Sequence, residues 1–165
     1  MKKLFLLMLL PVVISCGGSS EDEGLVSGAD GVIVETLANQ EVEAFFGMEL
    51  NFLGGTKHFF PETHESLCYM VNSREELENL YSGQQKLPDI DFSKHTLIIG
   101  QQRMPSTPYN VRSIQLRKTG SKYVLLLEVE RSEWVAGAFY DMGYWKLFQK
   151  VDKGPLEVKV SEIAK

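Results

Sequence analysis

The sequence has little cysteine, no apolar stretch long enough to span a membrane and no excess of basic residues. Two cysteines in 165 residues exclude a disulfide-rich scaffold, so packing must stabilise the fold. The apolar run at residues 4–14 is about half of the roughly 20 residues that a transmembrane helix needs. Because 17 basic residues face 22 acidic ones, nucleic acid is not expected as a partner.

Residues 1–15 have the layout of a secretory signal, with two lysines before the apolar run and a small residue before Cys16. The sequence Val-Ile-Ser-Cys that ends at Cys16 resembles the lipoprotein box of bacteria. That resemblance implies cleavage before Cys16 and a diacylglycerol on its sulfur. The alternative is an ordinary secreted protein in which Cys16 is incidental. We expect the lipid anchor.

Residues 16–30 are expected to form a flexible acidic tether, because residues 17–24 offer no apolar side chain to bury. The Ser-Glu-Asp-Glu cluster at 20–23 looks like the signal that sends some Gram-negative lipoproteins to the outer face of the outer membrane. Acidic residues that merely solvate a linker are an equal alternative. We expect an outer membrane lipoprotein, on the periplasmic face or the cell surface.

The mature chain would lose two lysines with the signal, which leaves 15 basic against 22 acidic residues and a net charge of −7. With Cys16 acylated, Cys68 remains alone, so no intramolecular disulfide is possible. Cys68 lies in an apolar segment, which favours a buried small hydrophobic residue over a reactive thiol.

Residues 31–165 are expected to form a single β-rich globular domain of the α+β class. Short alternating or β-branched segments predict strands, and Thr119-Gly120-Ser121 has the chemistry of a hairpin turn. The second half therefore predicts a mostly antiparallel meander, in a curved sheet or partly open barrel. The strands are expected at residues 32–37, 67–71, 96–99, 111–118, 123–129, 144–151 and 156–163.

One short amphipathic helix is expected to begin at Ser73, where Glu76 completes a capping box, and to end at Gly83. Residues 42–60 are aromatic but interrupted by glycines, so short strands or turns are predicted there.

No motif specifies catalysis, a metal or a cofactor. His64 and Cys68 are four residues apart, but a strand is predicted there and a second ligand pair is missing. The glutamates at 128, 130 and 133 alternate as on the solvent face of a strand. We expect no enzyme, no metal site and no cofactor.

Two loops hold the residue types that dominate protein interfaces. The loop at 103–109 is stiffened by two prolines, and a stiff loop loses less entropy on binding. The loop at 132–143 carries three aromatic residues, which either make contacts or fold back over the core. The candidate partner-binding residues are Arg103, Pro105, Tyr109, Trp134, Phe139 and Tyr140.

Residues 87–94 (Leu-Pro-Asp-Ile-Asp-Phe-Ser-Lys), the strand ending at Gly100, the Pro-Ser-Thr-Pro-Tyr-Asn-Val loop and the segment at 144–151 resemble the C-terminal domain of PrcB-type protease-complex lipoproteins. The likeness covers about residues 73 to 160. It implies association with an extracytoplasmic protease. The chain departs from the family at Pro108, where glycine is usual before Tyr109.

The same loop also looks like the Asn-Pro-Thr-Thr-Gly-Tyr loop of chagasin-type inhibitors of cysteine proteases. Proline cannot adopt positive φ, which argues against direct blocking of an active site.

The function expected from the sequence is a non-enzymatic, membrane-tethered module that binds another envelope or extracellular protein, with a protease as candidate partner. An alternative is a glycan or small-molecule binder whose cleft is lined by aromatic residues of the second half. A third reading is a hydrolase with an unrecognised carboxylate pair. The cleft of the alternative would use Trp134, Phe139, Tyr140 and Tyr144.

Overall fold

A computed structural model describes residues 31–50, 58–60, 63–105, 108–133 and 139–163. These residues form seven strands and two helices, in the order β1 (Val32–Val34), α1 (Gln40–Glu49), β2 (Leu67–Val71), α2 (Arg74–Leu80), β3 (His95–Met104), β4 (Tyr109–Thr119), β5 (Lys122–Arg131), β6 (Tyr140–Gln149) and β7 (Leu156–Ile163).

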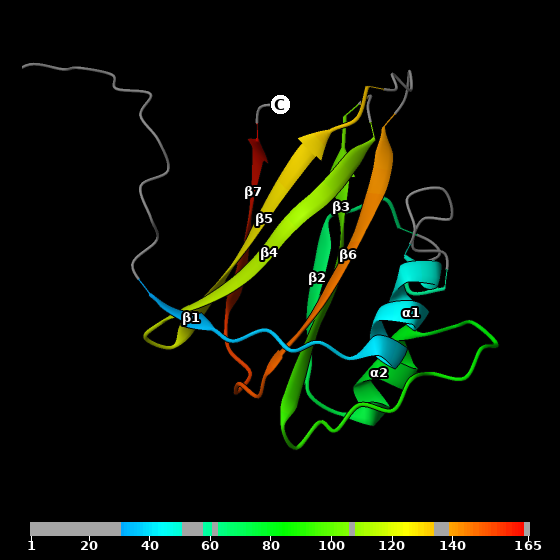
Figure 1. Ribbon diagram of the computed structural model, residues 1–165, viewed down its shortest axis with the longest axis vertical. Helices are drawn as coiled ribbons and strands as arrows, with labels where there is room; N and C mark the ends of the chain where they lie inside the picture. Colours follow the sequence, from blue (N-terminus) through cyan, green and yellow to red (C-terminus); the bar gives the residue numbers. More distant parts are fainter. Residues whose placement is uncertain (1–30, 51–57, 61–62, 106–107, 134–138, 164–165) are drawn as a thin grey trace, which may run out of the picture.

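The elements pack in three layers (Figure 1). One sheet has the strand order β1-β4-β5-β7, and it faces a second sheet of order β2-β3-β6. Helices α1 and α2 cover the outer face of the second sheet, where Phe46 and Leu77 are buried against Leu97. The second sheet is therefore covered on both faces.

β3 is the central strand of the second sheet and is buried over most of its length. Leu97 and Ile99 join the core beneath the helices, whereas Ile98 joins the core between the sheets. Side chains of a strand alternate between its two faces, so one strand supplies both cores. The buried strand predicted at 96–99 is confirmed.

The β-rich α+β character is confirmed, but the predicted meander is wrong in its strand order. Among the strands of the second half, β3 to β7, consecutive strands pair only in the β4–β5 hairpin, whose turn has Gly120 at φ 60°. β3 pairs with β6, and β7 lies parallel to β5. The strands therefore form two sheets, of four and three strands, rather than one curved sheet or partly open barrel.

The helix predicted after Ser73 is confirmed at Arg74–Leu80, although it ends before Gly83. The Ser73 hydroxyl accepts from the amide of Glu76, whose carboxylate accepts from the amide of Asn72. Tyr81 is already extended, at φ −105° and ψ 121°, which stops the helix.

The prediction of short strands or turns at residues 42–60 is wrong for residues 42–49, because residues 40–49 form α1, and residues 51–57 lie outside the described residues. The Asn39 side chain caps it by accepting from the amides of Glu41 and Val42. Its buried residues recur at helical spacing and pack on the second sheet. They are Val42, Phe45, Phe46 and Glu49.

The N-terminal part of the described chain packs with the second half. Val34, Cys68 and Met70 join the core between the sheets, to which β5 and β6 also contribute. Cys68 is free, as expected, and burial raises the pKa of its thiol to about 11.

Candidate functional site

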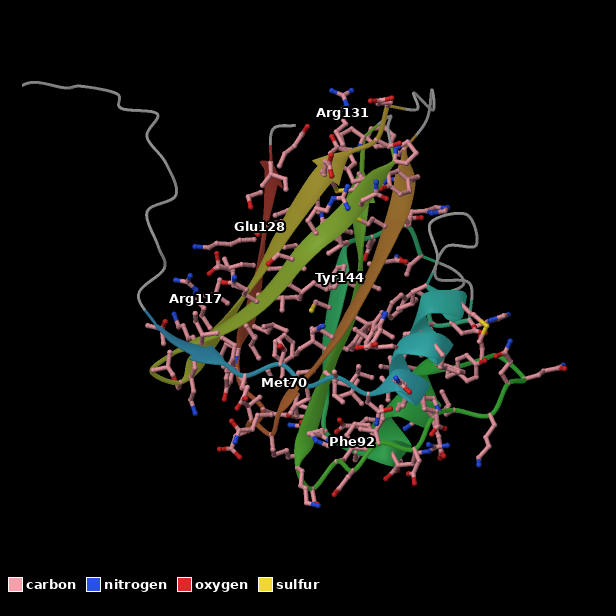
Figure 2. All side chains as sticks on the ribbon, in the orientation of Figure 1. Met70, Phe92, Arg117, Glu128, Arg131 and Tyr144 are labelled. Carbon is pink, nitrogen blue, oxygen red and sulfur yellow. The ribbon has the colours of Figure 1, made fainter. Side chains whose placement is uncertain are left out.

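The end of the sandwich where β3 leads to β4 and β5 leads to β6 is here named the loop end. Figure 2 shows Arg131 at this end and Phe92 at the opposite end. The loop end holds the most exposed aromatic side chain of the described residues, Phe139, which is 64% accessible. Arg103 and Pro105 are exposed there as well.

Arg103 is held beneath Phe139 by several contacts. Its guanidinium lies 5.1 Å from the centre of the Phe139 ring, a cation–π geometry. One guanidinium nitrogen lies 3.6 Å from Asp141 Oδ1 and 3.4 Å from the carbonyl oxygen of His64. The β3–β6 register, which pairs Arg103 with Asp141, brings these side chains together. These contacts fix the orientation of the Arg103 side chain.

The neighbouring segment at 63–66 is fixed to β3 and β6. Buried Gln101 donates to the carbonyl oxygens of Thr63 and Glu65, at 2.9 and 2.8 Å. His64 Nδ1 lies 2.6 Å from Asp141 Oδ2, and the histidine side chain is 79% exposed. Asp141 therefore orients both Arg103 and His64 at the loop end.

Two of the six predicted contact residues, Tyr109 and Tyr140, are packed and hydrogen-bonded within the chain. Tyr109 is buried, and its hydroxyl donates to Glu162 at 3.3 Å. Tyr140 is half-buried, and its hydroxyl accepts from the Tyr109 amide and donates to the Tyr109 carbonyl. Apolar patterning cannot distinguish such packed aromatics from exposed ones. Trp134 lies outside the described residues.

Replacing Tyr140 by phenylalanine is expected to lower the free energy of unfolding by about 1–3 kcal/mol, because the main-chain groups of Tyr109 lose their partner in a partly buried position. Burial raises the pKa of Tyr140, so the hydroxyl keeps the proton that it donates. Urea denaturation would measure the change. Tyr69→Phe, on a 38% exposed ring, is the control and should change stability by less than about 0.5 kcal/mol. Equal effects would contradict a bridging role for Tyr140.

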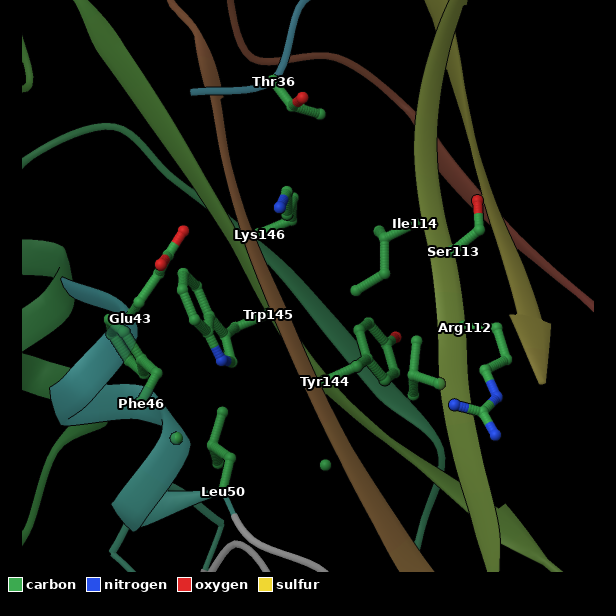
Figure 3. Close-up of a pocket in the computed structure, with 13 residues that line it drawn as sticks. Thr36, Glu43, Phe46, Leu50, Arg112, Ser113, Ile114, Tyr144, Trp145 and Lys146 are labelled. Carbon is green, nitrogen blue, oxygen red and sulfur yellow. The ribbon is translucent and has the colours of Figure 1, made fainter. Parts of the chain in front are cut away.

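A groove runs between α1, β6 and β4, below the loop end. It includes a hollow of about 540 Å³ that Phe46, Trp145, Tyr144 and Ile114 line. A second hollow continues along Tyr109, Asn110 and Met142. Figure 3 shows Trp145 over Phe46 on one side of β6, and Tyr144 and Ile114 between β6 and β4. We name the two hollows together the edge groove.

Of the four aromatics of the alternative cleft, Trp134 lies outside the described residues, and the other three are not brought together in one cleft. Tyr144 lines the edge groove, whereas Tyr140 binds the main chain of Tyr109 and Phe139 covers Arg103. A separate hollow of about 400 Å³ between α2 and β2 is lined by aromatics that the sequence did not single out. They are Phe59, Phe60, Tyr69 and Tyr81.

The titratable groups of the described residues do not assemble a metal centre. Within these residues, no three His, Cys, Asp or Glu side chains are grouped so that they could hold a metal ion. Glu49, 4% exposed, lies 2.5 Å from His58 Nδ1, and this pair anchors the end of α1. Glu130 is engaged by Arg112.

The search for a membrane span is also negative for the described part of the chain: neither helix there is both long and apolar enough to cross a bilayer. Comparison with protein-family models, with curated proteins and with solved structures finds no match in any of the three. The resemblance to PrcB-type lipoproteins stays a prediction.

Proposed function

We propose that the chain is a non-enzymatic protein-binding module, anchored at the outer membrane through a lipid on Cys16, and that it assists or modulates an extracytoplasmic protease. The single observation that supports binding is the pair of Phe139 and Arg103 at the loop end. The anchor rests on the lipoprotein box that ends at Cys16. The protease rests on the resemblance at 73–160.

The Phe139–Arg103 pair has the properties of an interface hot spot. Aromatic residues and arginine dominate the binding energy of protein interfaces. Arg103 is oriented by Asp141, so it loses little freedom on binding. The Phe139 ring is 64% exposed, so a partner that covers it removes apolar surface from water, which favours binding. Pro105, two residues after Arg103, is exposed and has a fixed φ.

Affinity capture tests this function. The full chain, immobilised in detergent, would be exposed to envelope and medium proteins of the producing cell, and retained proteins identified by mass spectrometry. We expect one retained protein, a protease or its associate, whose amount falls at least tenfold with Phe139→Ala or Arg103→Ala.

The control is Val160→Ala, an exposed apolar position on β7. It should retain the partner in full. Retention of the same set by all variants would contradict a binding surface at the loop end.

A further inference from the structure

Among the described residues, two strand edges along the edge groove have no partner strand, although the Tyr140 hydroxyl engages the main-chain groups of Tyr109. β1 covers β4 only at 116–118, so Tyr109–Gln115 pair with β5 alone among the described residues. Within the same described part, residues 140–146 of β6 pair only with β3. β4 is bulged between Val111 and Ser113. An uncovered edge presents main-chain donors and acceptors that can pair with another chain.

The chain itself closes the other end of this gap. Val32–Val34 pair with β4, and the next residues pair with β6: Leu37 N donates to Leu147 O at 3.0 Å, and Gln149 N donates to Glu35 O at 2.9 Å. Residues 32–37 were predicted as one strand, and the structure divides them between the two sheets. One extended segment thus contacts both edges.

The part of the gap that no described strand fills lies between the same two strands, β4 and β6. Residues 32–37 run antiparallel to both β4 and β6, so a second extended segment with that direction suits both edges. In an antiparallel pair, main-chain groups alternate between the two sides of a strand. The main-chain groups of Tyr109 face the Tyr140 hydroxyl, and the carbonyl of Leu147 faces Leu37. By this alternation, the main-chain groups of Val111 and Trp145 also face the gap. Gly143 follows the same alternation.

Lys146 gives the groove a charge preference. Tyr144 and Phe148, which lie two residues before and after Lys146 on the same face of β6, are buried between the sheets. Lys146 itself lines the groove. None of the described residues forms an ion pair with it, and Glu43 lines the same hollow without reaching it. An inward lysine also discourages edge-to-edge aggregation, which is the competing explanation.

We propose that an extended segment of a partner protein adds between β4 and β6, antiparallel to both, with an acidic side chain facing Lys146. Main-chain pairing supplies affinity in such strand addition, and the side chains that meet the groove supply specificity. This inference rests on the proposed function, because it states how the bound protein is held.

A library of random 12-residue peptides displayed on phage, selected on the full chain in detergent, is the probe. We expect enriched peptides that alternate apolar residues around one aspartate or glutamate. Lys146→Gln should weaken peptide binding at least tenfold, as measured by fluorescence anisotropy. Replacing the acidic residue of the peptide by its amide should have the same effect. Both changes together should cause no further loss. Lys122→Gln, in the distant hairpin, is the control and should leave the affinity unchanged.

N-methylation of the selected peptide tests the strand geometry. A segment held between two edges uses its amides on both sides, so methylating alternate amides in either phase should abolish binding. A peptide that pairs with one edge only would still bind when the amides of one of the two alternating sets are methylated. Exchange of the Val111 and Trp145 amides, followed by NMR, should slow when the peptide binds. No enrichment, or binding indifferent to Lys146→Gln and to both methylation phases, would overturn the proposal.

The two surfaces can be separated with the same variants. Partner capture lost with Phe139→Ala but kept with Lys146→Gln would support the loop-end function and refute strand addition. If peptide binding is lost with Lys146→Gln but partner capture is unchanged by Phe139→Ala, the result would support strand addition in the groove and refute the loop-end surface.

Discussion

Replacing Phe46 by alanine is expected to lower the free energy of unfolding by about 3–5 kcal/mol, the range for a fully buried aromatic residue. Its ring centre lies 5.0 Å from that of Trp145 in a stacked arrangement, and 5.1 and 5.6 Å from those of Phe45 and Phe59. Urea denaturation followed by tryptophan fluorescence would measure the loss, because Trp145 lies directly on the altered contact.

Met48→Ala is the control on the same helix, at a side chain that is 59% exposed. Its stability should change by less than about 0.5 kcal/mol. Comparable losses for the two variants would contradict the packing of α1 on β6. Since α1 forms one wall of the edge groove, Phe46→Ala should also weaken the selected peptides, whereas Met48→Ala should not.

Cys68 is expected to react with iodoacetamide at pH 8 about two orders of magnitude more slowly in the folded chain than in urea. Only the thiolate is alkylated, and burial raises the pKa of the Cys68 thiol to about 11, so the thiolate is scarce at that pH. Unfolding returns the thiol to its ordinary pKa. Mass spectrometry of the labelled chain, sampled over time, would follow the reaction at each cysteine.

The same labelling tests the lipid anchor. If Cys16 is acylated, the folded chain takes up almost no label and the unfolded chain takes up one. If Cys16 is free, it is labelled quickly in the folded chain as well, and the proposed anchor is wrong. Fast labelling of Cys68 before unfolding would instead contradict its burial.

Local patterns predicted the elements that depend on local chemistry. Alternation along β4, β5 and β7 marks their two faces, and the Ser73–Glu76 box marks the start of α2. α1 was not predicted although its buried residues recur at helical spacing, because Gly47 and the dense aromatics favour strands and turns over a helix. The Asn39 cap is the signal that would have identified it.

Strand order was not predictable from the same patterns. Alternation shows which face of a strand is buried but not which strand lies beside it. β3 and β6 are separated by a whole hairpin, yet their pairing builds the second sheet. The parallel β7 likewise follows from long-range packing.

The loop-end surface was predicted in part. Residue type alone indicated Arg103, Pro105 and Phe139, which the structure leaves exposed. The support from Asp141 and His64 depends on the β3–β6 register and so has no local signal. Tyr109 and Tyr140 share the residue types of contact sites but connect the two sheets instead.

The most direct test of the central claim is photo-crosslinking in the producing cell, with a photoreactive phenylalanine analogue at position 139 and, as control, at position 123 in the core between the sheets. The account predicts an adduct with one envelope or extracellular protein from position 139 and none from position 123. No adduct from position 139, or the same adducts from both positions, would contradict a protein-binding surface at the loop end.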